Sequence, residues 1–342
     1  MNDFSNKNIL LITAQFFGYE KALQNQLKKR GARVWYYDER PSNKNLHKGI
    51  IRVAPFLLKG KTKRYYQTIL EELKTEKIDY FLLIKGEATP FFFLKQFRQQ
   101  HPETQCIFYA YDSVTEYPKF LKLNSYFDKN FTFEARDAQQ YNLHFRPLFY
   151  IDEYAQPKVK SNGSTLYDIS FVGSAHTDRF TVGENIRKVA DKMGLKTFFY
   201  YYAPSKIIFY LKRIFDPYFK KFDIRQVKFQ SISHKDLAEI YQNSFAVLDI
   251  NKPFQLGLSM RPFETFVAQK KLITTNPEIV NYPFYHPNNI LVLDRDNIDI
   301  PISFFQTDFQ PLSDELLEKI SLDSWLDAIF LQPQDEYWKW WE

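Results

Sequence analysis

Apolar runs and amphipathic stretches alternate along the first half of the chain. Runs of consecutive apolar residues are typical of strands buried on both faces of a parallel sheet, whereas apolar residues at i, i+3 and i+4 indicate helices. Strands are predicted at residues 8–13, 32–38, 78–86, 105–112, 129–133 and 144–150. Helices are predicted at residues 18–31, 64–77 and 90–100, and a further helix opens near Glu134. This alternation predicts crossover connections and a parallel sheet.

The same alternation restarts at residue 168. Strands are predicted at residues 168–174, 196–202, 245–251, 272–275 and 289–293, and helices at residues 178–194 and 233–244. One further helix is predicted within "SMRPFETFVAQKKLITTNPEI", residues 259–279. Pro262 suits the first turn of a helix, because its missing N–H costs nothing there. Phe263, Phe266 and Val267 recur at helical spacing, so this helix is expected to pack on a core and to run directly into a strand.

Polar residues and chain breakers gather between the two alternating regions, at residues 152–168. We therefore expect an N-terminal domain at residues 1–155 and a second domain at residues 156–312. The last segment, 313–342, opens with a predicted amphipathic helix capped by Ser313 and is expected to pack back on the first domain. The predicted fold class is α/β, with two tandem Rossmann-like, doubly wound domains and a C-terminal amphipathic helix.

Composition is ordinary for a soluble globular protein, with 44% hydrophobic and 25% charged residues, and 342 residues are enough for two domains. The single cysteine, Cys106, lies in an apolar run and excludes an intrachain disulfide, which favours a reducing compartment. The N-terminal residues show no signal-peptide pattern, and no window reaches the roughly 18 apolar residues of a membrane span. We therefore expect a cytoplasmic protein whose membrane contact, if any, is peripheral, on the inner face of the cell membrane.

Positive charge is concentrated in two stretches. Residues 44–64 hold seven lysines or arginines and no acid, and basic residues outnumber acidic ones by eight to two at residues 196–228. The second stretch interleaves apolar and aromatic residues with the cations Lys206, Lys212, Arg213, Lys220 and Lys221. Such a mixture suits an anionic membrane surface. The alternatives are a nucleic-acid surface, where aromatic rings stack on bases, and an ordinary helix with its aromatics on the core and its lysines in water.

Several motifs that would name a chemistry are incomplete. "GKT" at residues 60–62 lacks the first glycine of a phosphate-binding loop, and no G-x-G-x-x-G is present. The six histidines are scattered without cysteine partners, so neither a metal site nor a cofactor is expected. "DRD" at residues 294–296 resembles the metal-binding Asp-x-Asp of one class of sugar transferases, but it follows a late strand and is predicted to be a solvated turn. No serine lies in a G-x-S-x-G elbow.

Polar residues follow the predicted strands of the second domain. In open α/β sheets, ligands bind beyond the carboxyl ends of the strands, where helix N-termini point. The residues at these positions are Gly173, Ser174, His176, Arg179, Asn251, Lys252, Arg261 and Glu264. Arginine forks suit a diphosphate, and a carboxylate one turn inside a helix can accept hydrogen bonds from two ribose hydroxyls. The set predicts a nucleotide-diphosphate pocket that needs no metal. The alternative is that Arg261 and Glu264 only stabilise a helix terminus.

Three segments, "DISFVGSAHTDR", "SHKDLAEIYQNSFAVLDIN" and "SMRPFETFVAQKKLITTNPEI", resemble the donor-binding domain of bacterial GT-B-fold glycosyltransferases. They are most similar to the group-1-like branch that includes spore-maturation-type proteins and capsule or lipopolysaccharide enzymes. The resemblance covers roughly residues 165–295, and the first domain only in outline. It implies that Glu264 binds the nucleotide ribose and that Arg261, or Arg179 as second candidate, faces the diphosphate. Many relatives carry a glutamate eight positions earlier, where this chain has Leu256, so the donor sugar and the stereochemical outcome stay open.

In a GT-B enzyme, the acceptor and any general base come from the strand ends of the first domain. The candidates here are Asp112, Glu87 and Glu20, each of which is alternatively a helix cap or a turn residue. A base must lie within hydrogen-bond reach of the acceptor hydroxyl. If no carboxylate is essential, a retaining mechanism is favoured, in which the phosphate of the donor takes the acceptor proton.

The leading functional hypothesis is a metal-independent glycosyltransferase. It would move a sugar from a nucleotide-diphosphate sugar to a cell-surface polysaccharide or a lipid-linked acceptor. A non-catalytic homologue that binds sugar nucleotides or glycans is the alternative suggested by Leu256, and a nucleic-acid-binding protein on a Rossmann-like scaffold is a third hypothesis. The expected partners are the donor, the glycan or lipid-linked acceptor and an anionic membrane surface, without nucleic acid.

Overall fold

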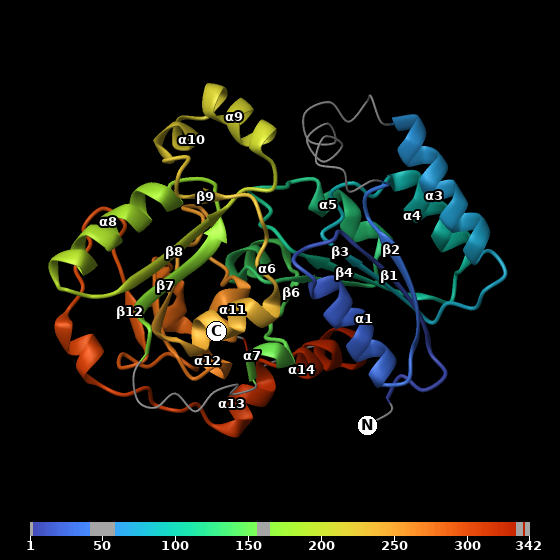
Figure 1. Cartoon of the computed structure of the whole chain (residues 1–342). Helices are drawn as coiled ribbons and strands as arrows, with labels where there is room; N and C mark the ends of the chain where they lie inside the picture. The colour runs from blue at the N-terminus through green and yellow to red at the C-terminus, as the bar shows by residue number, and fades with distance from the viewer. Residues whose placement is uncertain (1–2, 42–58, 156–164, 333–337, 339–342) are drawn as a thin grey trace. The chain divides into compact units, whose positions relative to one another are not determined.

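Two parallel six-stranded sheets form the framework of the chain, one in each of two units (Figure 1). A computed structural model describes residues 3–41, 59–155, 165–332 and 338. Unit 1 consists of Met1–Pro147 and Trp325–Glu342, and unit 2 of Leu148–Ser324. The chain therefore enters unit 2 before the predicted boundary at residue 155. It returns to unit 1 within the segment that was expected to begin at residue 313.

The sheet of unit 1 has the strand order β2-β1-β3-β4-β5-β6, which is the flavodoxin-like order extended by one strand. Its strands are β1 (Asn8–Thr13), β2 (Arg33–Asp38), β3 (Tyr80–Ile84), β4 (Gln105–Ala110), β5 (Lys129–Thr132) and β6 (His144–Phe145). Its helices include α1 (Tyr19–Lys29), α3 (Lys59–Leu73), α4 (Phe91–Gln100), α5 (Phe120–Leu123) and α6 (Ala135–Tyr141). Leu10 and Ile12 of β1 share one core with Tyr66 of α3 and Phe93 of α4, whereas α1 lies on the other face of the sheet (Figure 1).

The sheet of unit 2 has the strand order β12-β11-β10-β7-β8-β9, which is the Rossmann order. Its strands are β7 (Tyr167–Ser174), β8 (Thr197–Tyr202), β9 (Val227–Lys228), β10 (Ser244–Asp249), β11 (Lys271–Thr274) and β12 (Ile290–Val292). Its helices include α7 (Asp152–Ala155), α8 (Arg179–Lys192), α9 (Lys206–Phe215), α10 (Pro217–Lys221), α11 (His234–Gln242), α12 (Met260–Val267) and α13 (Asp314–Lys319). Phe171 of β7 and Leu248 of β10 share a core with Ile186 of α8 and Phe209 of α9. The predicted class, two Rossmann-like α/β domains, is confirmed.

The C-terminal amphipathic helix is not continuous as predicted. Instead of one helix over residues 313–331, the chain forms α13, α14 (Leu322–Leu326) and a π-helical turn, η5 (Asp327–Leu331). The interruption falls where Ser321 makes a parallel bridge with Tyr150 and its hydroxyl accepts the backbone N–H of Ser324. From Trp325 onward the segment belongs to unit 1, where the ring of Trp325 contacts the ring of Tyr109 at 4.8 Å. The ring of Trp338 lies 5.4 Å from the guanidinium carbon of the buried Arg146.

Other predicted boundaries also shift. The strand expected at residues 144–150 is only the two residues of β6, and the helix expected at residues 64–77 begins at Lys59 and ends at Leu73. Within the basic aromatic segment of residues 196–228, the chain forms α9 and α10 between β8 and β9. Cys106 is fully buried, as expected, and burial raises the pKa of its thiol to about 11. The other basic stretch, residues 44–64, lies mostly outside the described residues.

Candidate functional site

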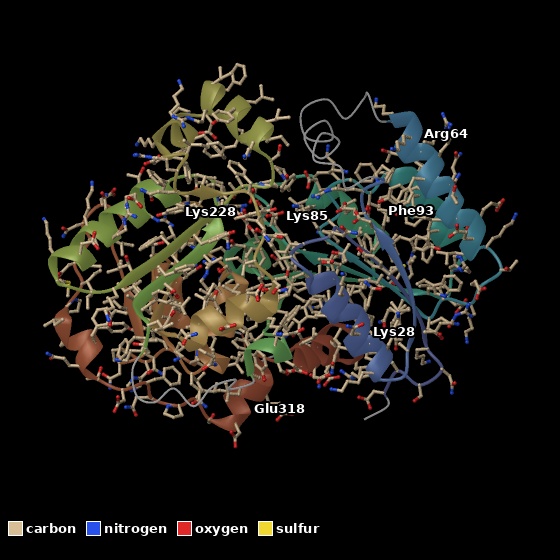
Figure 2. The ribbon with its side chains drawn as sticks, in the orientation of Figure 1. Lys28, Arg64, Lys85, Phe93, Lys228 and Glu318 are labelled. Carbon is tan, nitrogen blue, oxygen red and sulfur yellow. The ribbon has the colours of Figure 1, made fainter. Side chains whose placement is uncertain are left out.

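The strand order of unit 2 reverses direction between β7 and β10, so the carboxyl ends of these two strands form the switch point where α/β sheets bind ligands. Ser174 ends β7 and is followed by His176 and Arg179, while Asp249 ends β10 and is followed by Asn251. The helix α12 then begins at Met260. Figure 2 labels Lys228, which ends the edge strand β9 of the same parallel sheet. The residues predicted for a donor pocket therefore meet at one edge of the unit-2 sheet.

Arg179 is a buried cation at this edge, with an exposed fraction of 9%. Its Nε donates to the carbonyl oxygen of Ile250 at 2.7 Å, and Nη1 donates to that of Ser174 at 3.4 Å. No carboxylate of the described residues forms an ion pair with it. Burial, followed by repulsion from Arg261, lowers the pKa of Arg179 to about 9, although Asp249 acts in the opposite direction. The guanidinium of Arg179 is therefore charged although burial disfavours its charge, and a bound anion would offset this free-energy cost.

Arg261 occupies the first turn of α12 and is held differently. Its Nη1 lies 2.6 Å from Oδ1 of the fully buried Asp249, and Nη2 donates to the carbonyl oxygen of Val172. Asp249 also accepts hydrogen bonds from the hydroxyls of Ser259 and Thr274. Burial acts to lower the pKa of Arg261, but the negative groups around it, Asp249 among them, outweigh burial and raise the pKa. The Asp249 ion pair therefore fixes the start of α12 to the end of β10.

Arg295 is a third guanidinium at the same edge and was not predicted as a site residue. It lies between the two aspartates of "DRD", just beyond β12, and its Nη1 donates to Oδ2 of Asp178 at 2.8 Å. Its Nη2 donates to the carbonyl oxygen of Asn251 at 2.6 Å and to the side-chain oxygen of the same residue. The aspartates form the solvated turn that was expected, because Asp294 accepts the N–H of Asp296 and both are exposed.

The pKa of His176 is shifted by burial and by the cations around the ring. Burial lowers its pKa well below the usual value, and Arg179, Lys252, Lys212 and Arg261 lower it further, so the ring is neutral at physiological pH. Its Nδ1 lies 3.2 Å from the hydroxyl oxygen of Thr177. These cations come from α8, α9, α12 and the segment after β10. Four separate parts of unit 2 therefore direct positive charge toward the segment that follows β7.

The backbone that precedes His176 is closely packed. Gly173 lies beside the ring of Phe171, and a Cβ atom at this position would come within 2.6 Å of that ring. A larger residue at 173 would therefore displace the end of β7. On the other side, Asn251 is 4% exposed, and its side-chain amide donates to the carbonyl oxygen of Gln255 at 2.7 Å. This bond closes the loop between β10 and α12 on itself.

Glu264 lies inside α12, one turn beyond the first residue of the helix. It is 3% exposed, and Oε2 accepts from the hydroxyl of Tyr241 at 3.5 Å. Burial raises the pKa of Tyr154 strongly, and the charge of Glu264 raises it further. The hydroxyl of Tyr154 lies 2.8 Å from Nδ1 of His234. Two tyrosines, on α7 and α11, therefore surround this carboxylate, and neither was predicted to do so.

Leu256 lies in the loop before α12, at the position where many relatives of the resembled family have a glutamate. Its carbonyl oxygen accepts the side-chain amide of the fully buried Asn276 at 2.8 Å. The side-chain oxygen of Asn276 in turn accepts the N–H of Glu278 at 3.1 Å. The loop is thus held by its backbone, and position 256 supplies no charged side chain.

In unit 1, the carboxyl ends of β3 and β4 bring together two of the predicted catalytic candidates. Nζ of Lys85, which is labelled in Figure 2, lies 2.9 Å from Oδ2 of Asp112 and 3.3 Å from Oε2 of Glu87. Glu87 also contacts Nη2 of Arg40 at 3.4 Å and accepts from the hydroxyl of Tyr117 at 2.9 Å. Lys85 has a φ of 80°, a left-handed conformation that is uncommon for a residue with a side chain. Lys85, in this uncommon conformation, therefore forms ion pairs with both Asp112 and Glu87.

The third candidate, Glu20, lies apart from these contacts, on α1. Its Oε2 accepts the backbone N–H groups of Phe16 at 3.0 Å and Gly18 at 3.2 Å, so it holds the turn between β1 and α1. A fourth acid, Glu39, was not predicted. It is fully buried beyond β2, and its Oε1 accepts the N–H groups of Ala88 and Thr89. Burial raises its pKa to about 6, against the opposing effect of its bond to Ala88 and of nearby cations.

The described residues, 3–41, 59–155, 165–332 and 338, also bear on metal binding and membrane insertion. Within them, no group of three or more His, Cys, Asp or Glu side chains is arranged to hold a metal ion. Of the described helices, none is long and apolar enough to cross a membrane.

Several solved structures have a similar arrangement of two parallel sheets. An alpha-glucosyltransferase in complex with UDP and a 13-mer DNA matches with a TM-score of 0.55 and 12% identity, over 97% of both chains. A protein assigned as a UDP-N-acetylglucosamine 2-epimerase from Listeria monocytogenes matches with a TM-score of 0.54 and 8% identity, over 97% of this chain and 99% of that one.

The apo structure of OtsA matches with a TM-score of 0.52 and 13% identity, over 85% of this chain and 89% of that one. The chain has the GT-B fold. At these identities the similarity establishes the fold alone. No family model matches the sequence, and no curated protein matches it either.

Proposed function

We propose that this GT-B chain is a glycosyltransferase that takes its sugar from a nucleotide-diphosphate sugar without using a metal ion. The observation that carries the proposal is the buried Arg179, which has no carboxylate partner among the described residues and lies near Arg261 and Arg295 at the switch point. A diphosphate supplies the negative charge that Arg179 lacks, in the bidentate geometry that guanidinium groups bind best.

The same charge is suited to the chemistry of transfer. The bond between the anomeric carbon and the diphosphate oxygen breaks, and the acceptor hydroxyl oxygen forms the new bond to that carbon. Negative charge then grows on the departing diphosphate, where Arg179 and the neutral N–H of His176 would stabilise it. A fixed cluster of cations can perform the role that a divalent ion performs elsewhere.

The nucleoside would be held by α12. Glu264 is a buried carboxylate one turn inside this helix, and its two oxygens can accept from the two vicinal hydroxyls of a ribose. The hydroxyl of Tyr241 makes a long contact with one of them, at 3.5 Å. A ribose hydroxyl that replaced this contact would form a shorter, charge-assisted bond.

The acceptor proton requires a destination. In an inverting reaction it passes to a carboxylate of unit 1, for which Asp112 is the first candidate and Glu87 the second. In a retaining reaction the departing phosphate takes the proton. We propose a cell-surface polysaccharide or a lipid-linked glycan as the acceptor, which the resemblance to capsule and lipopolysaccharide enzymes supports.

A second candidate function is a non-catalytic protein that binds sugar nucleotides or glycans. It is favoured by Leu256, which provides no carboxylate beside the donor site, and by the ion pairs that Lys85 makes with Asp112 and Glu87. Such a protein would bind a nucleoside diphosphate tightly and show no turnover. Both candidate functions predict nucleotide binding, so turnover is the measurement that separates them.

Calorimetry with UDP, GDP, dTDP, CDP and CMP, first without and then with magnesium, tests the donor site. We expect one diphosphate to bind equally well in both conditions. Its 2′,3′-dideoxy form should bind wild type at least about tenfold more weakly, because hydrogen bonds to a charged group are lost. Glu264→Gln should bind both forms alike, whereas wild-type discrimination retained in this variant would remove the ribose role.

Donor consumption and product analysis then separate the reactions. Transfer to water or to an added glycan supports the transferase, binding without turnover supports the non-catalytic protein, and isomerised donor would indicate epimerase chemistry. If no nucleotide binds at all, the donor-site proposal is wrong.

A further inference from the structure

A helical hairpin, formed by α9 and α10, connects β8 to β9 in unit 2 and is fixed to the core on one side only. Phe209 of α9 is 1% exposed, and its ring packs at 5.6 Å from that of Phe219 and at 6.0 Å from that of Phe222. These rings belong to the main core of unit 2. Figure 1 shows both helices standing beyond the ends of β8 and β9. The hairpin is therefore packed on the core of unit 2 by its inner face, and its outer face is directed away from that core.

The outer face is apolar. Ile207, Tyr210, Leu211 and Ile214 recur at i, i+3, i+4 and i+7, and their exposed fractions are 72%, 53%, 52% and 62%. Phe215 is 82% exposed at the end of the same helix. In an amphipathic helix of a globular protein, such a stripe faces the core. Here the stripe faces away from it, so the ordinary explanation of this helix, with its apolar residues inside and its lysines in water, does not account for it.

Positive charge borders the apolar stripe. The basic residues of the hairpin are Lys206, Lys212, Arg213, Lys220 and Lys221. The one acid between residues 205 and 222 is Asp216, and it caps α10 by accepting the backbone N–H of Tyr218 at 2.9 Å. Lys220 and Lys221 are exposed. Apolar side chains ringed by cations match a surface that is apolar within and anionic outside, which is a bilayer that contains anionic lipid.

We infer that the α9–α10 hairpin docks unit 2 on an anionic membrane surface, with Ile214 and Phe215 entering the headgroup region and Lys220 and Lys221 meeting lipid phosphates. The commitment to lipid rests on the composition of the face. A protein partner of matching charge would need acidic groups around an apolar centre, whereas an anionic bilayer presents both features over its whole surface.

The position of the hairpin determines which edge of the unit-2 sheet would face the membrane. Because α9 follows the carboxyl end of β8, it lies at the same edge of the sheet as Arg179 and His176. Lys212 of α9 is also among the cations that lower the pKa of His176. Docking would therefore hold the carboxyl edge of unit 2 close to the leaflet. The inference stands without the proposed transferase activity, since it concerns lipid binding alone.

Vesicle flotation of the full-length protein tests this inference. Wild type should float with vesicles of mixed phosphatidylcholine and phosphatidylglycerol at low salt, and not with pure phosphatidylcholine. Ile214→Ser with Phe215→Ser should lower the partition coefficient at least about tenfold, because two apolar side chains no longer leave water. Lys220→Ala with Lys221→Ala should lower it roughly 30-fold, since each cation near an anionic leaflet contributes about fivefold.

Matched controls come from other exposed positions of unit 2. Ile302→Ser removes an apolar side chain that is 51% exposed, and Lys188→Ala with Lys192→Ala removes two exposed cations from α8. Both should partition like wild type. Equal losses in the control and hairpin variants would mean that only net charge or general hydrophobicity matters, and would overturn the inference.

A fluorescent probe gives a second, independent result. The only cysteine, Cys106, is fully buried, so Phe215→Cys offers one reactive thiol for a polarity-sensitive fluorophore. Anionic vesicles should shift its emission to the blue, and the probe at Ile302→Cys should not respond. Emission that shifts on raising the protein concentration without lipid would instead identify a second copy of the chain as the occupant. Emission that is already blue in the dilute protein would identify another segment of the same chain.

Discussion

Nη1 of Arg261 lies 2.6 Å from Oδ1 of Asp249, whereas Arg179 at the same sheet edge has no ion pair among the described residues. The charge of Arg261 is therefore neutralised before any ligand arrives, and the charge of Arg179 is not. The two arginines that were predicted to face the diphosphate therefore differ in their roles. Arg261 fixes the helix that carries Glu264, and Arg179 is the stronger attraction for an anion.

Asp249→Asn should destabilise unit 2 strongly. It leaves the guanidinium of Arg261 buried without its carboxylate, and breaking one side of a buried ion pair costs about 3–5 kcal/mol. Thermal denaturation should show a clearly lower midpoint for this variant, with Asp296→Asn, an exposed aspartate, as control. If the two variants melt alike, Asp249 does not neutralise Arg261 in solution.

Arg179→Met should weaken binding of the nucleoside diphosphate by about 10- to 150-fold, the range for a lost hydrogen bond to a charged group. Binding of the nucleoside without phosphates should not change, because Arg179 would contact only the diphosphate. Arg179→Lys should recover part of the loss, since lysine keeps the charge but not the fork. The exposed Arg225→Met provides the control, and calorimetry the measurement. Equal losses for nucleoside and diphosphate would place Arg179 away from the phosphates.

The sequence allowed the two parallel sheets to be predicted because their strands are continuous apolar runs, such as residues 8–13 and 245–251. It also indicated which residues follow those strands. The order of the strands could not be predicted, because it depends on contacts between apolar runs that are distant in the sequence and similar in composition. Only the observed order, with β7 beside β10, places Arg179 and Arg261 at one switch point.

Arg295 shows why part of the site was missed. Its two neighbours form a solvated turn, so the local pattern is that of a surface loop, and only the tertiary position of the end of β12 brings the arginine to Asp178 and Asn251. The C-terminal helix failed for a related reason. Its helical periodicity is genuine, but the bridge between Tyr150 and Ser321 interrupts the helix, and local periodicity cannot reveal a contact between such distant residues.

Glu39 should make the stability of unit 1 depend on pH. Its pKa is raised to about 6 in the folded chain, from an ordinary value of 4.5. The stabilisation from the neutral form is complete below 4.5 and is lost as the pH rises through 6. The loss amounts to about 2 kcal/mol at neutral pH, because each unit of pKa corresponds to about 1.4 kcal/mol.

Glu39→Gln should remove this dependence, so its thermal midpoint should exceed that of wild type at about pH 7.5 and approach it at about pH 4.5. Glu103→Gln, at an exposed position, should follow wild type at both. A Glu39→Gln curve that stays parallel to that of wild type would show that the buried carboxyl does not titrate in this range.

Tyr154→Phe should weaken nucleotide binding without touching the nucleotide. Its hydroxyl contacts Nδ1 of His234 at 2.8 Å, and the charge of Glu264 acts on its pKa, so the tyrosine helps to position that carboxylate. We expect a loss of about fivefold in affinity for the ribonucleotide, as for one neutral hydrogen bond, and a smaller loss for its 2′,3′-dideoxy form. Equal losses for the two forms would mean that Tyr154 supports the fold of α7 and α11 and not the orientation of Glu264.

Lys85 forms ion pairs with both catalytic candidates of unit 1. Asp112 has its ion pair with Lys85 at 2.9 Å, whereas Glu87 contacts Lys85, Arg40 and the hydroxyl of Tyr117. Asp112 is the first candidate for the general base, which must lie within hydrogen-bond reach of the acceptor hydroxyl. Asp112→Asn should lower kcat by about 10²- to 10⁴-fold, the usual contribution of a general base. Donor affinity should stay the same, because the donor residues belong to unit 2.

The pH profile separates a base from a residue that only supports the fold. In an inverting enzyme, Asp112→Asn should also remove the acidic limb of the kcat/KM profile, while Glu87→Gln lowers kcat less and keeps that limb. Glu103→Gln serves as the exposed control. If Asp112→Asn and Glu87→Gln both turn over like wild type, no carboxylate of this cluster takes the acceptor proton. The product should then retain the anomeric configuration of the donor, because the departing phosphate acts as the base.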